Sequence, residues 1–348
     1  MSKSIKKVFY EKITFEKLLQ AHNRAKKGKT FKEEILKFEV DLETNIINII
    51  NEIKSGSYKI GNYKTFIIYE PKERIIKSLP YKDRIVHQWY VEEFIKPYFL
   101  PRFINDTYAC IPNRGTHKAI YKLQKYMRIK KRNFNDYYIL KCDIKKYFYS
   151  IDKNILLNIL KKYIKDNDLI DFSKILIYDG EEVGIPIGNY TSQFFANIYL
   201  NELDQYVKHI LKVHYYLRFM DDFILLVKDK EEAKILLKKI SIFINNELKL
   251  ELNNKTRYYT NKMGVDFCGY IIHEKYILIR KRSKKKIKKN IKKWNKLYEN
   301  DSLDIKKVRL QFNSWVNHSR HANTYNLRIK LFNKILFKDE FIRMNVKI

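Results

Sequence analysis

The chain has 348 residues, of which 45% are hydrophobic and 15% are aromatic. This length and composition predict a folded protein of two or three lobes and exclude a disordered chain. The formal net charge is +32, so we expect a polyanionic partner, with nucleic acid favoured over an anionic membrane surface.

The cysteine content and the hydropathy of the sequence indicate the cellular compartment of the protein. Cys110, Cys142 and Cys268 are odd in number and far apart, which argues against a disulfide framework or a structural zinc site and fits a reducing compartment. The sequence shows neither a signal-peptide pattern nor an apolar run long enough to span a membrane. We therefore expect a cytoplasmic protein with no membrane partner.

Hydrophobic periodicity predicts the elements in chain order. It indicates helices over 14–55 and 83–97, strands over 63–69 and 137–144, and a helix over 191–207 with Thr191 or Ser192 near its N-cap. Residues 214–228 predict two strands around a tight turn at Met220-Asp221. A helix over 231–249, short strands within 264–280 and a basic helical region from about 283 complete the chain. This order predicts an α+β fold with helices on one face of a split βαβ sheet.

Three carboxylates occupy positions suited to chemistry. Asp143 closes an apolar strand, and Asp221-Asp222 lie at the tip of an apolar hairpin. A lone Asp at a strand end is usually a solvated cap, but adjacent carboxylates between two hydrophobic strands repel each other unless a cation neutralises them. Hard oxygen ligands suit Mg²⁺, and two such ions would activate a 3′-hydroxyl and stabilise a leaving pyrophosphate oxygen.

The segments around these carboxylates form an ordered series of motifs. They are PKERIIKSLPYKDRIVHQ (71–88), INDTYACIPNRGTHKA (104–119), KCDIKKYFYSI (141–151), GIPIGNYTSQFFANIYLNELD (184–204), YYLRFMDDFILL (215–226), LELNNKTRY (250–258) and FCGY (267–270). Together they resemble the fingers and palm motifs of bacterial reverse transcriptases, with Phe219 in place of the usual Tyr of the YxDD hairpin. The resemblance implies an RNA-directed DNA polymerase with fingers, palm and helical thumb: an N-terminal helical segment (1–57), fingers and palm (58–280) and a basic thumb (281–348).

The resemblance also implies roles at the metal centre. Asp143, Asp221 and Asp222, with the backbone carbonyl of Ile144, would hold two Mg²⁺ ions, with Mn²⁺ as an alternative. Lys255 would act on the departing pyrophosphate as a general acid, although a surface lysine is an equally good interpretation.

Nucleotide-binding roles follow from the same resemblance. Lys72 and Arg74 would contact the triphosphate of an incoming dNTP, although a solvated surface is the alternative in so basic a chain. Phe148 would be the steric gate against a 2′-hydroxyl; core packing is its alternative role. The second motif would place its Ile187-Gly188 and Gln193 beside the nucleotide.

Primer and template contacts are expected farther along the chain. The FCGY segment (Phe267, Cys268, Gly269, Tyr270) resembles the primer grip. Residues 280–296 carry eleven basic residues and no acidic one, and Ile287, Ile291 and Trp294 share one helical face. Either this is an amphipathic helix with a solvated side, or its lysines follow the template–primer phosphates; the lysines in question are Lys284, Lys285, Lys288, Lys289 and Lys292.

The second motif, residues 184–204, indicates which subgroup of reverse transcriptases the chain resembles. Most reverse transcriptases have Gln before its Gly and end it in Ser-Pro, whereas this chain has Ile187-Gly188 and Ser192-Gln193. This form resembles the enzymes of diversity-generating retroelements, which copy a template RNA into cDNA with errors at adenines and act with a structured non-coding RNA and a small oligomeric accessory protein. A defence-associated bacterial reverse transcriptase is the alternative. An inactive palm-fold RNA-binding scaffold is a further alternative, against which the intact carboxylates argue.

Overall fold

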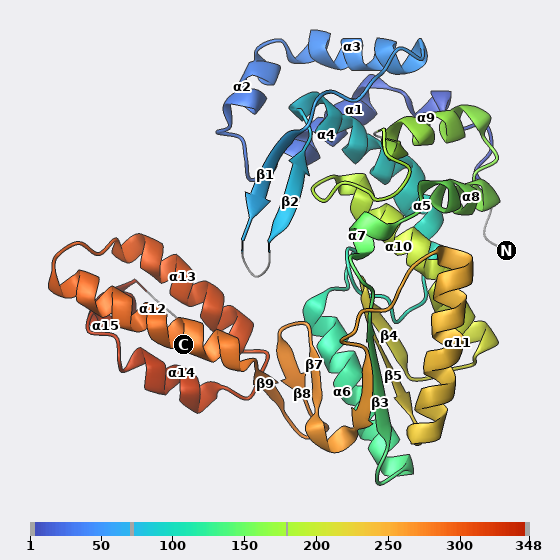
Figure 1. Cartoon of the computed structure of the whole chain (residues 1–348). Coiled ribbons are helices and arrows are strands. Elements are labelled where there is room, and N and C mark those ends of the chain that lie inside the picture. The colour runs from blue at the N-terminus through green and yellow to red at the C-terminus, as the bar shows by residue number, and fades with distance from the viewer. Residues whose placement is uncertain (1–3, 70–72, 179, 345–348) are drawn as a thin grey trace. The chain divides into compact units, whose positions relative to one another are not determined.

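The structure is a computed structural model that describes residues 4–69, 73–178 and 180–344. Its contacts divide the chain into two compact units. The first comprises Met1–Asn113, Cys142–Phe223 and Ile235–Thr256, and the second comprises Arg114–Lys141, Ile224–Lys234 and Arg257–Ile348. Both units are therefore built from segments that are distant in sequence, and each mixes helices with strands in an α+β fold (Figure 1).

The first unit begins with helices. The region predicted as helical over 14–55 forms three of them, α1 (Phe15–Lys26), α2 (Glu33–Val40) and α3 (Leu42–Lys54). The Thr14 side chain caps α1 by accepting a hydrogen bond from the Lys17 amide. Next come the β1–β2 hairpin (Lys64–Ile68 and Arg74–Ser78), α4 (Tyr81–Tyr90), a π-helical turn (Val91–Ile95) and α5 (Lys96–Phe99).

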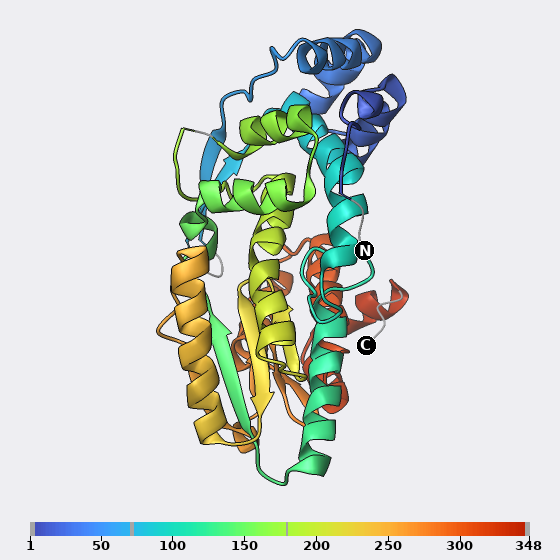
Figure 2. The ribbon, with the colours of Figure 1, turned by 90° about the vertical axis from the view of Figure 1, so that its right-hand side faces the viewer.

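The N-terminal segment is held by a distant part of the first unit. Ile5 forms a parallel bridge with Ile164, just after α8 (Lys153–Tyr163). The Asp166 carboxylate accepts hydrogen bonds from the Val8 and Phe9 amides at 2.7 and 3.0 Å, and it also caps α9 (Asn167–Ile177). The buried carboxylate of Asp166 thus stabilises both the segment at Val8 and Phe9 and the start of helix α9. Figure 2 shows α8 and α9 packed beside each other.

A four-stranded sheet has the strand order β4-β5-β3-β6. Its strands are β3 (Tyr138–Asp143), β4 (Tyr216–Phe219), β5 (Asp222–Val227) and β6 (Arg257–Thr260). Residues Phe223 to Val227 of β5 are all buried, as its unbroken apolar run indicates. The predicted strands and the turn at Met220-Asp221 are confirmed.

Helix α10 (Tyr190–Gln205) begins one residue before the predicted start, and its predicted cap is wrong. The N-cap is Asn189, which makes no capping hydrogen bond through its side chain. Thr191 and Ser192 lie inside the first turn and are buried, and the Thr191 hydroxyl is 2.8 Å from Nδ1 of buried His87. Tertiary hydrogen bonding, not capping, therefore explains the hydroxyl at position 191. Helix α11 (Lys230–Leu248) follows the β4–β5 hairpin.

The second unit contains α6 (Thr116–Asn133), a three-stranded antiparallel sheet and four C-terminal helices. The strands are β7 (Val265–Phe267), β8 (Tyr270–Ile272) and β9 (Ile277–Ile279), and β8 packs on α6 (Figure 1). The helices are α12 (Lys281–Glu299), α13 (Ile305–Ser319), α14 (Tyr325–Phe332) and α15 (Lys338–Arg343). They enclose a hydrophobic core centred on fully buried Phe312, Val316 and Phe341. Within the described residues, no helix has the length and apolarity needed to cross a membrane.

Candidate active site

The β4–β5 hairpin presents two of the three predicted carboxylates. Its strands are buried up to Arg218 and from Phe223 onward, whereas Asp221 and Asp222 are half-buried at the turn. Met220 has a φ of 57°, in the left-handed region that side chains other than glycine rarely adopt. The turn therefore places adjacent carboxylates at a water-accessible tip on a rigid apolar base.

Asp143 is the last residue of β3, which is next to β5 in the sheet. Its amide donates to the Thr256 hydroxyl at 3.3 Å, and its carbonyl accepts from the Asn253 amide at 2.7 Å. Ile144, whose carbonyl is a predicted metal ligand, bridges Leu252. Backbone pairing to residues 251–253 therefore fixes the strand end that carries Asp143.

Lys255 is exposed on the turn that follows this pairing. Its amide donates to the Asn253 side chain at 3.1 Å, and the Thr256 amide donates to the Asn253 carbonyl at 2.8 Å. Because the same Asn253 is bonded to Asp143, the fold brings the backbones of Lys255 and Asp143 into one neighbourhood. The exposed side chain is compatible with either of its two interpretations.

Two of the nucleotide-binding candidates, Ile187 and Gly188, lie against strand β2, which carries a third, Arg74. The Lys77 amide donates to the Ile187 carbonyl at 3.0 Å, and a Cβ on Gly188 would lie only 2.5 Å from the Lys77 carbonyl oxygen. With a φ of 132°, Gly188 also has a backbone conformation that disfavours any side chain. The second motif therefore needs glycine at 188 so that its loop can approach β2 closely.

Phe148 belongs to the short helix α7 (Tyr147–Ser150) and is half-buried. Its carbonyl accepts from the Ile185 amide at 2.8 Å, which joins the first motif to the second. Arg74, the first residue of β2, and Gln193, in the first turn of α10, are both exposed. Five of the six nucleotide-binding candidates thus lie on elements of the first unit, and Lys72 lies outside the described residues.

The primer-grip candidates occupy the β7–β8 turn of the second unit. The side chains of Phe267 and Tyr270 are fully buried, and the Tyr270 hydroxyl bonds to Nδ1 and the carbonyl of His318. Cys268 and Gly269 form the turn, both with positive φ, and are half-exposed. The turn therefore exposes part of Cys268 and Gly269, and the two buried aromatic rings flank it in the sequence.

Helix α12 separates its two faces as its sequence predicts. Ile287, Ile291 and Trp294 are buried in the core of the C-terminal helices. The predicted contact lysines lie on the other side; Lys285, Lys288, Lys289 and Lys292 are exposed, and Lys284 is half-buried. The exposed face is available to follow a line of phosphates.

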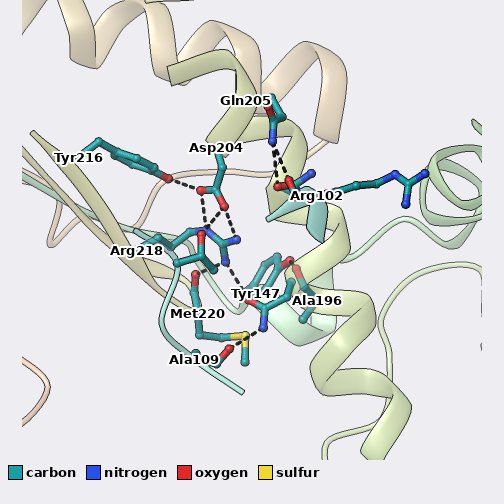
Figure 3. A network of polar contacts seen from close by, with 12 residues as sticks. Arg102, Ala109, Tyr147, Ala196, Asp204, Gln205, Tyr216, Arg218 and Met220 are labelled. Carbon is teal, nitrogen blue, oxygen red and sulfur yellow. Dashed lines mark hydrogen bonds and ion pairs between the residues drawn. The ribbon is translucent and has the colours of Figure 1, made fainter. Parts of the chain in front are cut away.

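The sequence analysis missed a buried polar network beneath the catalytic hairpin. Arg218 of β4 and Asp204 of α10 are fully buried and form a two-pronged ion pair, with Nε–Oδ1 at 2.7 Å and the second pair of atoms at 2.6 Å (Figure 3). Burial lowers the pKa of Arg218, but the charge and hydrogen bonds of Asp204 raise it by more, so the pKa is above its ordinary value. An arginine inside the apolar run YYLRFM was the available signal, because charged residues are rarely buried without a partner.

Tyr147 lies next to this network. Its hydroxyl donates to the Ala196 carbonyl of α10 at 2.5 Å (Figure 3). Burial is the largest reason that the Tyr147 pKa is well above its usual value; Arg218 opposes this shift, and Tyr199, Asp221 and Asp204 add to it. The phenol therefore stays neutral and adds no further negative charge near the carboxylates.

Comparison with known proteins agrees with this arrangement. Residues 64–272, more than half of the chain, match the family described as reverse transcriptase (RNA-dependent DNA polymerase). A relative is the Group II intron-encoded protein LtrA of Lactococcus lactis subsp. cremoris, 23% identical over 325 residues, with 72% of this chain and 53% of that protein covered. The chain thus spans about half the length of this curated relative.

Similar solved structures include two telomerases. One, from Candida albicans in complex with a fragment of telomeric RNA, has a TM-score of 0.48 at 12% identity and covers 88% of this chain and 66% of its own. Another, apo telomerase from Candida tropicalis, has a TM-score of 0.46 at 14% identity and covers 66% of this chain and 59% of its own. The family match itself spans the three carboxylates, the second motif and the FCGY turn, and it confirms the predicted family. The chain belongs to the reverse transcriptase (RNA-dependent DNA polymerase) family.

Proposed function

We propose that this protein is an RNA-directed DNA polymerase that extends a primer with dNTPs along a template RNA. The observation that carries the proposal is the pairing of positions: Asp143 ends β3, and Asp221-Asp222 form the turn that opens the neighbouring strand β5. Residues 58–280 would supply fingers and palm, residues 281–348 the thumb, and residues 1–57 an N-terminal helical segment. The +32 net charge favours a nucleic-acid partner.

Reverse transcriptase domains use divalent metal ions, and the donor set here suits them. The carboxylates of Asp143, Asp221 and Asp222 and the Ile144 carbonyl are hard oxygen donors of the kind that Mg²⁺ prefers, with Mn²⁺ as an alternative. Across residues 4–69, 73–178 and 180–344, no three His, Cys, Asp or Glu side chains are grouped as metal ligands, so the ligand set is part of the proposal. Two bound ions would lower the pKa of the primer 3′-hydroxyl and stabilise the leaving pyrophosphate.

The protein's own side chains would then orient the nucleotide. Arg74 would pair with phosphate oxygens through its planar fork. Phe148 would pack under the sugar and exclude a 2′-hydroxyl, and Lys255 would donate a proton to the leaving group. Gln193 and the Ile187-Gly188 loop would complete the pocket beside β2.

Primer extension on a defined RNA with Mg²⁺ tests this proposal. Asp221→Ala should lower incorporation by about 10²–10³-fold or more, because charge that develops in the transition state is then uncompensated. RNA binding should remain, since the exposed lysines are unchanged. Asp171→Ala, an exposed carboxylate on α9, is the matched control and should retain activity. Normal extension by Asp221→Ala would overturn the proposed role of the carboxylates, whereas no extension by the parent protein would overturn the polymerase proposal and favour an RNA-binding scaffold.

We further propose that the enzyme belongs to a diversity-generating retroelement and makes error-prone cDNA with a structured non-coding RNA and an accessory oligomer. Half-buried Ile187, whose backbone is bound to β2, supports this assignment. Isoleucine has no donor or acceptor, and a site that reads by apolar contact discriminates by only a few kcal/mol.

Ile187→Gln should therefore lower the error rate of the enzyme. The measurement is sequencing of cDNA that both proteins copy from one RNA, with errors sorted by template base. Equal and low error rates in both proteins would contradict the retroelement assignment but leave the polymerase proposal intact.

Two other settings remain as candidates. The similarity to an intron-encoded protein favours an enzyme that copies an intron RNA, and the motif form also occurs in defence-associated reverse transcriptases. The neighbouring genes separate the three settings. A near-repeat pair differing at adenines indicates a retroelement, and flanking intron sequence indicates an enzyme that copies an intron RNA. A locus that has neither feature favours the defence-associated setting.

A further inference from the structure

The turn that carries Asp221 and Asp222 needs support from outside itself. Met220 has a left-handed backbone, which is unfavourable for a residue with a Cβ. The adjacent carboxylates also repel each other, which favours a looser turn. A hairpin tip with both features keeps one geometry only if surrounding structure determines it.

Arg218 supplies a contact to this turn. Its Nη1 atom donates to the Met220 carbonyl at 3.0 Å and to Oδ1 of Asn197 at 3.1 Å. Figure 3 shows the guanidinium between Asp204 and Met220. One planar group therefore joins helix α10 to the residue that precedes Asp221.

The other side of the guanidinium is fixed by Asp204. That carboxylate binds Nε and Nη2 of Arg218, and it also accepts hydrogen bonds from the Tyr216 hydroxyl at 2.6 Å and the Thr107 hydroxyl at 2.8 Å. Asp204 thus balances the arginine charge locally. Arg218 can hold the turn without acting as the counter-cation of the catalytic carboxylates.

We propose that Arg218 is a positioning residue, which holds the Met220 carbonyl against α10 and so sets the direction of the Asp221 and Asp222 carboxylates. The proposal rests on the proposed function. The first turn of helix α10 also carries the nucleotide-binding candidate Gln193. One helix therefore sets the position of both the carboxylate turn and a nucleotide contact.

Arg218→Lys tests the proposal because it keeps the charge but loses the fork, so one ammonium cannot serve both Asp204 and Met220. Primer extension should show kcat lowered by about ten- to a hundredfold, with KM for dNTP changed less than threefold. The half-saturating Mg²⁺ concentration should rise at least threefold. Arg84→Lys is the matched control: Arg84 also forms a fork, to Glu34, and this variant should keep the parental kcat and Mg²⁺ response.

Two readouts do not depend on turnover. Mn²⁺ binding to the protein without substrate, followed by electron paramagnetic resonance, should weaken at least threefold in Arg218→Lys. Hydrogen–deuterium exchange of the peptide covering 216–224 should accelerate in this variant and stay at the parental rate in Arg84→Lys. A purely structural role would instead change exchange across the whole first unit.

Asn197→Ala provides the second variant, because it leaves the Arg218–Asp204 pair intact and removes the hydrogen bond from Nη1 to Asn197, together with that from Asn197 Nδ2 to the Ala109 carbonyl. It should show the same changes to a smaller extent, and it decides the question if Arg218→Lys does not fold. A folded Arg218→Lys, or in its place Asn197→Ala, with parental kcat, Mn²⁺ affinity and exchange would overturn the positioning role alone. No primer extension by the parent protein would overturn the proposed function, and full activity of Asp221→Ala would remove the catalytic role of the turn on which this inference rests.

Discussion

The exposure of Phe148 bears on whether its side chain packs in the core or acts as the steric gate against ribonucleotides. It is half-buried, its ring lies 5.7 Å from that of buried Tyr147, and its carbonyl holds the second motif. A gate requires such a ring: supported on one side and open on the other. The partial exposure therefore favours the gate over simple core packing.

Phe148→Ala should admit ribonucleotides, because a methyl group leaves room for a 2′-hydroxyl that the ring excludes. The measurement is the ratio of kcat/KM for dNTP and rNTP, which should fall by at least tenfold. Tyr149→Ala, which removes the exposed ring next to it, should leave the ratio unchanged. An unchanged ratio in Phe148→Ala would mean that the ring is core.

His87 predicts a pH dependence of stability. It is fully buried, and burial lowers its pKa to about 3. The folded state therefore keeps His87 neutral at pH values where an unfolded histidine, with a pKa of about 6.5, binds a proton. The stabilising contribution is complete above about pH 6.5 and is lost as the pH falls toward 3, by about 1.4 kcal/mol per pH unit.

Urea unfolding of the parent and of His87→Gln between pH 7 and 4 measures this effect. The free energy of unfolding of the parent should fall more steeply with decreasing pH than that of the variant. His22, His318 and His321, whose pKa values are also lowered mainly by burial, contribute equally to both proteins. Parallel slopes would show that His87 is protonated or exposed in the folded state.

At the scale of elements, helix α12 has two faces of clearly different character. Its apolar face packs into the C-terminal core, and four of its five candidate lysines are exposed on the other side. A helix that only needed solubility would have no reason to exclude acidic residues from positions 280–296. The one-signed charge of this stretch supports the proposal that its lysines bind phosphates.

Replacing Lys285, Lys288, Lys289 and Lys292 by Gln should weaken template–primer binding and flatten its salt dependence. Each lost phosphate contact should lower the slope of log K against log salt by somewhat under one unit. Fluorescence anisotropy at several salt concentrations measures the slope. The control replaces exposed lysines of the first unit, and it changes the net charge equally: Lys27, Lys29, Lys32 and Lys54. Equal slopes in both variants would assign the effect to net charge.

At the scale of the whole molecule, local patterns predicted what local forces determine. The β4–β5 hairpin and α12 follow from alternation and helical spacing, and the adjacent Asp221 and Asp222 follow from the turn between apolar strands. Periodicity did not reveal the break at Asp41 between α2 and α3, because both helices continue the apolar repeat. The helix limits there depend on tertiary packing.

The part of the site that could not be predicted from the sequence depends on contacts between separate segments of the chain. Arg218 depends on Asp204 across the core of the first unit, and its backbone bridges Thr107, more than a hundred residues earlier. Likewise, Gly188 is required by the approach of Lys77, which belongs to another motif. Such partners are chosen by the folded topology, and no single segment contains the information.

The bridge between Ile5 and Ile164, with Asp166 bound to the Val8 and Phe9 amides, has a consequence for synthesis on the ribosome. Ile5, Val8 and Phe9 cannot reach their native partners until the ribosome has added about 160 more residues. At roughly 5–20 residues per second this delay is about ten to thirty seconds. During this time the apolar Ile5 and Phe9, both buried in the finished protein, remain open to chaperones, so the N-terminal segment should be among the last parts of the first unit to become protected in a nascent chain.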